Sequence, residues 1–143
     1  MRNRHHAHRI AVGTDGSDNA HQAVTWAIEN SQPGDTVILV HVWHPYVYGS
    51  ELGAVYTLDD SGAAALLDGE FDKYLPFATE HEVMLKKDLI QGDARTALQI
   101  ANIDLLVVGA RGHGGLTGLL LGSVADYISK HSAIPVVIVP TQK

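Results

Sequence analysis

Residues 109–124 (GARGHGGLTGLLLGSV) contain six glycines and lead into a segment with helical spacing. Glycine destabilises regular structure by roughly 0.5–1 kcal/mol at each interior position, so this cluster indicates tight turns or a ligand that approaches the backbone closely. A glycine loop before a helix N-terminus offers free amide groups and the positive end of the helix dipole. The chemistry that this segment favours is the binding of an anion such as a phosphate group.

Two common phosphate-binding motifs are absent from this segment. A P-loop requires a lysine, and residues 109–129 contain none. A dinucleotide motif that starts at Gly112 requires glycine where Thr117 stands. The segment instead has Gly109, two residues, Gly112, nine residues, and then Gly122 and Ser123.

Continuous apolar runs predict the strands that must carry such a loop. Each of the first four runs is followed by a segment with helical spacing or helix-capping residues, and Ser17 is the expected N-cap of the first helix. Strands without polar alternation that are joined by helices indicate a parallel sheet buried on both faces. The tyrosine-rich residues 44–62 are expected to form a long loop. The predicted strands are residues 10–14, 36–43, 83–90, 104–108 and 135–139.

The composition restricts the class of protein. The chain has 143 residues, is 45% hydrophobic and has no cysteine, which predicts one domain without disulfides or zinc-thiolate sites. A formal net charge of −6 with only ten Lys and Arg argues against a nucleic-acid partner. No apolar stretch reaches the roughly 18 residues of a membrane span, and no signal-peptide pattern is present. We expect a cytoplasmic protein with a disordered tail at residues 1–9 and a single domain at 10–143.

Three segments together resemble the universal stress protein family, in its ATP-binding branch. They are IAVGTDGSDNA from residue 10, TVILVHVW from residue 36, and the G-x2-G-x9-G-S spacing of the glycine segment. The resemblance implies an α/β fold with a doubly wound, open, five-stranded parallel sheet of order 3-2-1-4-5 and helices on both faces. It further implies an ATP site, with Mg²⁺, between strands 1 and 4, a regulatory role in the stress response, and a homodimer through the strand 5 edge from Pro135 to Val139.

The resemblance also implies roles for individual positions in three groups. The turn after strand 1 and one main-chain position of strand 2 correspond to the adenosine end of the nucleotide. The beginning of the glycine segment corresponds to the ribose and phosphates, and its end corresponds to the helix start that receives the phosphates. The matching positions are Gly13, Thr14, Asp15, Val42, Gly109, Arg111, Gly112, Gly122, Ser123 and Val124.

Each candidate side chain also has a purely structural interpretation. Ser123 stands where a serine would cap a helix, and Asp15 is typical of a turn in which the carboxylate accepts a backbone hydrogen bond. Arg111 is as consistent with a solvated loop cation as with a phosphate partner. His41 is expected to be a hydrogen-bonded core histidine. The histidines of the tail lack the spacing of a metal site, so no metal ligands are predicted.

The function has alternatives at this point. Rapid phosphoryl transfer requires a cation at the β- and γ-phosphates and a group that orients the nucleophile. Only Arg111 and His113 lie nearby in the sequence, so slow ATP hydrolysis or self-phosphorylation is the most that we expect, and no catalytic residue is predicted. AMP or cyclic AMP is an alternative ligand, since the motif does not determine the number of phosphates. A dimeric interaction scaffold with an empty nucleotide site is the remaining alternative.

Overall fold

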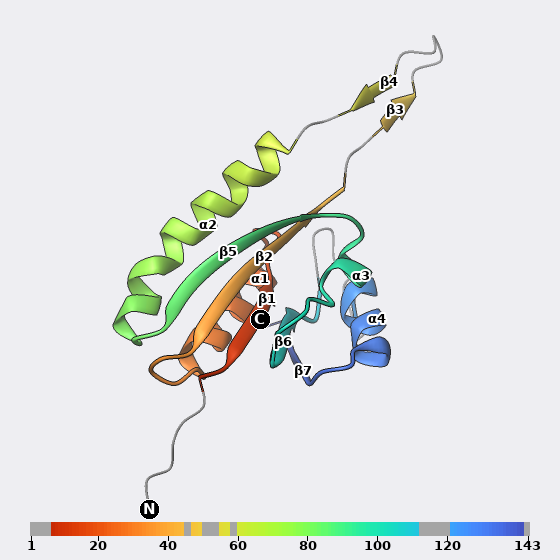
Figure 1. The fold of residues 1–143 in the computed structure, drawn as a ribbon. Helices are drawn as coiled ribbons and strands as arrows, with labels where there is room; N and C mark the ends of the chain where they lie inside the picture. Colours follow the sequence, from red (N-terminus) through yellow and green to blue (C-terminus); the bar gives the residue numbers. More distant parts are fainter. Residues whose placement is uncertain (1–6, 45–46, 50–54, 58–59, 112–120, 142–143) are drawn as a thin grey trace, which may run out of the picture.

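The five main strands form one parallel sheet in the computed structural model, which describes residues 7–44, 47–49, 55–57, 60–111 and 121–141. Its order is β5-β2-β1-β6-β7 (Figure 1). Counted along the main sheet, this is the expected order 3-2-1-4-5, and the prediction is confirmed. The strands are β1 (Arg9–Gly13), β2 (Thr36–Trp43), β5 (Met84–Gln91), β6 (Leu105–Gly109) and β7 (Val136–Val139).

In the described part of the chain, four helices cover the two faces of this sheet. They are α1 (Asp18–Glu29), α2 (Ser61–Glu80), α3 (Ala94–Ala97) and α4 (Ser123–His131). Helices α1 and α2 pack on one face, where the side chains of Val12 and Leu39 lie. Helices α3 and α4 border the other face, where those of Ala11 and Val40 lie. Because successive side chains of a strand point to opposite faces, the apolar residues of the central strands β1, β2 and β6 are buried on both sides of the sheet.

The region between β2 and α2 differs from the expected long loop. It contains β3 (Val47–Gly49) and β4 (Val55–Thr57), which pair antiparallel with Tyr48 opposite Tyr56. Valine, tyrosine and threonine favour strands, and a two-stranded ribbon needs no long period in the sequence to form. The ribbon extends beyond the C-terminal end of β2, away from the main sheet (Figure 1).

The start of the domain is held by two aspartates. The amide of His8 donates to Asp35 Oδ1 at 2.9 Å, and that of Arg9 donates to Asp104 Oδ2 at 2.8 Å. β1 therefore begins at Arg9, within the segment expected to be a tail. None of the helices in the described ranges is long and apolar enough to cross a membrane.

The segment between β5 and β6 is mostly irregular. The sequence predicts a short helix from residue 92 to about residue 101, but α3 covers only Ala94–Ala97. Leu98 ends the helix by turning into the core, where a Cβ built on Gly13 would lie 3.2 Å from Leu98 Cδ1. The helix ends at this point because Leu98 packs closely on β1, and an irregular segment then leads to the start of β6.

Candidate functional site: the switch between β1 and β6

The C-terminal ends of β1 and β6 lie side by side at the point where the strand order reverses. Val12 stands opposite Val107 in this pair, and from here the chain winds outward to β2 and β5 on one side and to β7 on the other. Open α/β sheets bind ligands at such a switch point, outside the carboxyl ends of the strands. The structure thus brings the turn after Gly13 and the segment after Gly109 to one edge.

The turn after β1 is held by the end of β2. Thr14 is buried; its amide donates to the carbonyl of Val40 at 2.8 Å, and its carbonyl accepts from His41 Nδ1 at 2.7 Å. His41 is therefore hydrogen-bonded, as predicted. Asp15 Oδ1 accepts the amide of Ser17 at 2.9 Å, which is the structural role that the sequence left open for this aspartate. Ser17 also caps α1, as predicted.

The main chain of Val42 lies beyond the C-terminal end of β1, next to the point where the strand order reverses. In a parallel strand, a residue directs its N–H and C=O to the same neighbour, and successive residues alternate between neighbours. The carbonyl of Val40 faces β1, where Thr14 donates to it, and that of Trp43 faces β5, where Gly92 donates to it at 2.9 Å. The N–H and C=O of Val42 therefore face the β1 side, beyond the point where β1 ends.

Gly109 is a glycine because α1 packs directly on it. A Cβ built on this residue would lie 2.7 Å from Asn19 Oδ1 and 3.0 Å from the Asn19 carbonyl oxygen. Real Cβ atoms essentially never come as close as the shorter of these distances. The sequence interpretation assigned Gly109 to the ribose and phosphates, but protein packing alone is enough to require glycine here.

Asn19 is the residue of this edge that sequence reasoning missed. Its side chain is only 5% exposed, and its Nδ2 donates to Gln22 Oε1 at 3.0 Å and to the carbonyl of Val139 at 3.2 Å. Its Oδ1 accepts the amide of Arg111 at 2.7 Å. A polar residue in the first turn of a helix is typical of local capping, so the sequence offered no signal that Asn19 contacts residues distant in the chain.

The two ends of the glycine segment are joined to each other. The amide of Gly122 donates to the carbonyl of Ala110 at 2.6 Å, and the amide of Ala110 donates to the carbonyl of Val139 at 2.9 Å. Gly112, the middle glycine of the predicted motif, lies outside the described residues, as do residues 113–120. The described ends of the segment therefore meet at the C-terminal ends of β6 and β7.

Helix α4 begins directly after Gly122. Gly122 is the N-cap, with φ −63° and ψ 160°, and Ser123 is the first helical residue, so the alternative interpretation of Ser123 as a helix cap does not hold. The first helical hydrogen bond runs from the amide of Asp126 to the carbonyl of Gly122 at 2.9 Å. Helix geometry provides no intrahelical acceptor for the amides of Ser123 and Val124. These amides can therefore bind an anion.

An ion pair lies at the same C-terminal edge of the sheet, in the segment that follows β5. Arg95 donates to both carboxylate oxygens of Asp93, with Nε–Oδ1 at 3.1 Å and Nη2–Oδ2 at 2.8 Å. These hydrogen bonds lower the pKa of Asp93 to about 2. The Arg95 guanidinium also lies 5.9 Å from the ring centre of Tyr127, which connects α3 to α4. The described residues contain no group of three or more metal-ligating side chains.

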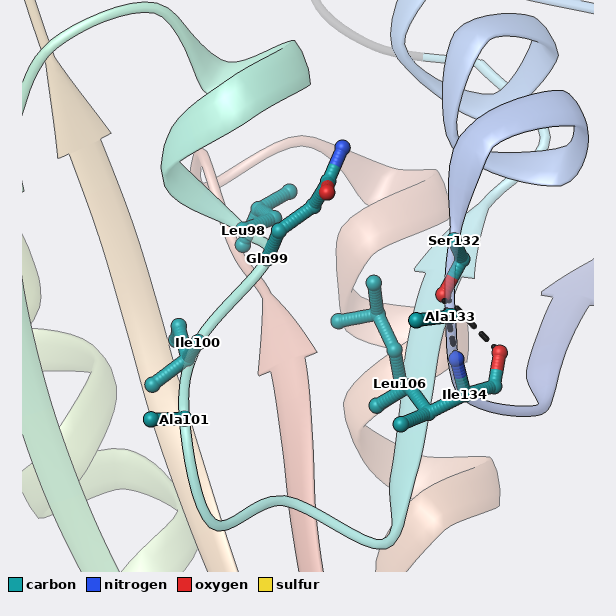
Figure 2. A pocket seen from close by; sticks show the side chains of 8 residues that line it. All are labelled: Leu98, Gln99, Ile100, Ala101, Leu106, Ser132, Ala133 and Ile134. Carbon is teal, nitrogen blue, oxygen red and sulfur yellow. Dashed lines mark hydrogen bonds between the residues drawn. The ribbon is translucent and has the colours of Figure 1, made fainter.

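A separate apolar hollow of about 240 Å³ lies away from this edge (Figure 2). It is bordered by the connections from α3 to β6 and from α4 to β7, and its walls include Leu98, Ile100, Leu106 and Ile134. Ser132 Oγ donates to the carbonyl of Ile134 at 2.8 Å and accepts its amide at 3.2 Å, so the hydroxyl is satisfied within the protein. None of the residues that line the hollow is among the predicted site residues.

The fold is that of a doubly wound α/β domain whose strand order reverses between its first and fourth main strands. Residues 6–140 match the model of the universal stress protein family. The chain belongs to the universal stress protein family.

Relatives support this assignment at the level of sequence. A universal stress protein of Mycobacterium tuberculosis is 32% identical over 135 residues, which cover 90% of this chain and 44% of the relative. The chain thus spans about half the length of such curated relatives.

Solved structures support the fold. The universal stress protein UspA from Lactobacillus plantarum has a TM-score of 0.74 at 20% identity and covers 95% of this chain and 99% of its own. A universal stress protein in complex with cAMP has a TM-score of 0.66 at 26% identity, with 92% and 95% covered. A family member from Arabidopsis thaliana with AMP bound has a TM-score of 0.63 at 19% identity, with 94% and 92% covered.

Proposed function

We propose that this chain binds an adenine nucleotide at the C-terminal edge of β1 and β6 and acts as a nucleotide-dependent regulatory module of the stress response. The observation that carries the proposal is the convergence of three elements at the switch point: the turn after Gly13, the main chain of Val42 and the first turn of α4. The cAMP and AMP in the two structural relatives support the class of ligand.

Each of the three elements suits a different part of the nucleotide. The N–H and C=O of Val42 match the donor and acceptor edge of adenine. The carboxylate of Asp15 is suited to ribose hydroxyl groups, which donate to it. The amides of Ser123 and Val124, with the Ser123 hydroxyl, are suited to phosphate oxygens.

The remaining predicted positions support the site in two ways. Arg111 adds a positive charge at the beginning of the glycine segment. Gly13 and Gly109 act indirectly, because their missing side chains make room for Leu98 and Asn19 rather than for the ligand. Gly112 belongs to the proposal only through its spacing in the sequence.

We propose ATP as the ligand, because the full G-x2-G-x9-G-S spacing is present, with Mg²⁺ carried by the phosphates. The ion adds positive charge to the bound phosphates, and no residue of this chain is assigned to it. No catalytic residue is proposed, so hydrolysis is slow at most. AMP and cyclic AMP are the competing ligands that the experiment must separate from ATP.

The test starts with the purified protein. We would denature it, identify any released nucleotide by chromatography, and titrate the emptied protein with ATP, AMP and cyclic AMP by calorimetry, with and without Mg²⁺. Binding of ATP in preference to the others supports the proposal. Tighter binding of AMP or cyclic AMP would identify that nucleotide as the ligand instead of ATP. If the titrations with all three nucleotides give no heat of binding, nucleotide binding is refuted.

A variant of Gly122 tests the location of the site. The backbone of Gly122 has a conformation that any residue adopts, so Gly122→Val should leave the fold unchanged while its side chain crowds the start of α4. Gly62→Val is the matched control, because a Cβ at Gly62 meets no atom within 4 Å. Loss of binding in the first variant alone is expected. Unchanged affinity in Gly122→Val would show that the site lies elsewhere.

We also propose that two copies associate through the β7 edge. Among the described residues, β7 pairs with β6 alone, and its side chains Val136, Val137 and Ile138 are only partly buried. An open apolar strand edge is an aggregation hazard that a second copy removes. The carbonyls of Pro135 and Val139 face β6, so by alternation the N–H groups of Val136 and Ile138 face the open edge.

The β7 edge allows a precise test of association. Val136→Pro removes an amide that faces the open edge without removing a hydrogen bond to β6. Val136→Ala is the control, because it shortens the same side chain and keeps the amide. In sedimentation experiments we expect a dimer for the wild type and the alanine variant and a monomer for the proline variant. A monomeric wild type would contradict the proposal.

A further inference from the structure

The buried amide of Asn19 contacts the main chain at the beginning of the glycine segment. Asn19 belongs to the first turn of α1, yet its partners lie in three places: Gln22 in the same helix, Val139 at the end of β7, and Arg111 after β6. Asn19 is not among the ten positions that the sequence assigned to the nucleotide. Its two Nδ2 hydrogens and its Oδ1 are all used, so the orientation of the side chain is determined.

The contact with Arg111 is the one that depends on Asn19. The carbonyl of Val139 also accepts the amide of Ala110 at 2.9 Å, so it remains satisfied without Asn19. The amide of Arg111 donates to Asn19 Oδ1 at 2.7 Å. Removing the Asn19 side chain would therefore release the main chain of Arg111 while leaving the end of β7 in place.

Releasing the main chain of Arg111 would also affect the start of α4, because the neighbouring peptide group is hydrogen-bonded to it. The carbonyl of Ala110 accepts the amide of Gly122, the N-cap of α4, at 2.6 Å. The peptide between Ala110 and Arg111 thus connects Asn19 on one side to the start of α4 on the other. Asn19 also packs directly on Gly109, so the Asn19 side chain has no room to shift toward the sheet.

We propose that Asn19 is a positioning residue for the phosphate side of the nucleotide site. It fixes the main chain at Arg111 and, through Ala110, the start of α4 that receives the phosphates. This inference rests on the proposed function. The adenosine side, formed by the turn at Thr14 and the main chain of Val42, is held by β2 and does not depend on Asn19.

The experiment compares ATP with adenosine. In Asn19→Ala, calorimetry should show ATP affinity about tenfold weaker, as expected for one lost hydrogen bond to a buried group. Adenosine affinity should be unchanged, and the amide of Arg111 should exchange its hydrogen faster. The control is Ala27→Gly, a buried position near the other end of α1, which destabilises the same helix and should change neither affinity.

Three results would overturn the inference. One is equal ATP affinity in Asn19→Ala and the wild type, with wild-type binding intact; the proposed function then stands without it. Another is an equal loss for adenosine and ATP, which indicates a general loss of structure. The third is a wild type that binds no adenine nucleotide, which refutes the proposed function as well. If the alanine variant does not fold, Asn19→Ser is measured; its shorter hydroxyl should give the same difference between ATP and adenosine.

Discussion

Replacing Gly109 by alanine tests the packing of α1 on the end of β6. The added Cβ would lie 2.7 Å from Asn19 Oδ1, 2.8 Å from Asn19 Cγ and 3.0 Å from the Asn19 carbonyl oxygen. A rotation of the Asn19 side chain alone does not relieve the contact, because the carbonyl oxygen belongs to the helix backbone. We therefore expect Gly109→Ala to destabilise the protein.

The size of the effect follows from two ways of relieving the clash. If Asn19 stays in place, the strain of overpacking costs about 1–3 kcal/mol. If its side chain moves, the hydrogen bonds to Arg111 and Val139 are lost, at about 1 kcal/mol each, and the buried amide loses its partners. We expect the free energy of unfolding to fall by about 2–3 kcal/mol, less than the typical total of about 5–15 kcal/mol.

Urea denaturation followed by circular dichroism measures this change. With a slope of about 1–3 kcal/mol per molar, the unfolding midpoint should fall by about 0.7–3 M at an unchanged slope. Gly69→Ala is the matched control: Gly69 lies within α2, and a Cβ there meets no atom within 4 Å. This variant should raise the stability by about 0.5–1 kcal/mol. A midpoint for Gly109→Ala at or above that of the wild type would refute the packing argument.

The other predictions concern single side chains. Removal of the α1 cap in Ser17→Ala should lower the free energy of unfolding by about 1 kcal/mol in the same assay. The hydrogen bonds from Arg95 lower the pKa of Asp93 to about 2, so the stability contributed by this carboxylate is present above about pH 4 and is lost as the pH falls toward about 2. An NMR titration should show this low pKa, and Arg95→Gln should raise it. Burial, and then the charge of Glu70, raise the pKa of Tyr74, so stability should fall above about pH 10 in the wild type and less in Tyr74→Phe.

Each of these has a contradicting result. A stability of Ser17→Ala equal to that of the wild type would show that the cap hydrogen bond contributes nothing. An Asp93 carboxyl that titrates at its ordinary value would mean that the ion pair does not form in solution. Identical loss of stability at high pH in the wild type and Tyr74→Phe would show that other groups dominate the alkaline response.

The strands of the sheet and the helices could be predicted from local patterns in the sequence. The runs IAVGT and TVILVHVW are mostly apolar without polar alternation, which favours strands buried on both faces. Ser17 could be predicted as a cap because its hydroxyl accepts from Ala20, three residues away. The β3–β4 ribbon was missed, since strands of three residues are too short to give a recognisable period.

The site was predictable only in outline. Glycine spacing and the DGS turn indicated the edge of the sheet, and the expected strand order places the turn and the beginning of the glycine segment at that edge. The reasons for individual residues differed. Ser123 follows the cap instead of being it, and Gly109 makes room for a helix. A pattern of residue types does not distinguish a glycine that a ligand requires from one that a neighbouring side chain requires.

Secondary structure followed from interactions between residues close in the chain, which leave a pattern in the sequence, whereas the strand order was implied by the family resemblance. The contacts of Asn19 leave no such pattern, because its partners Arg111 and Val139 lie 92 and 120 positions away. Those partners come within hydrogen-bonding distance only after the sheet has formed and α1 has packed on it. The general form of this edge of the sheet could therefore be predicted from the sequence, whereas the hydrogen bonds that hold its main chain in place arise from tertiary packing.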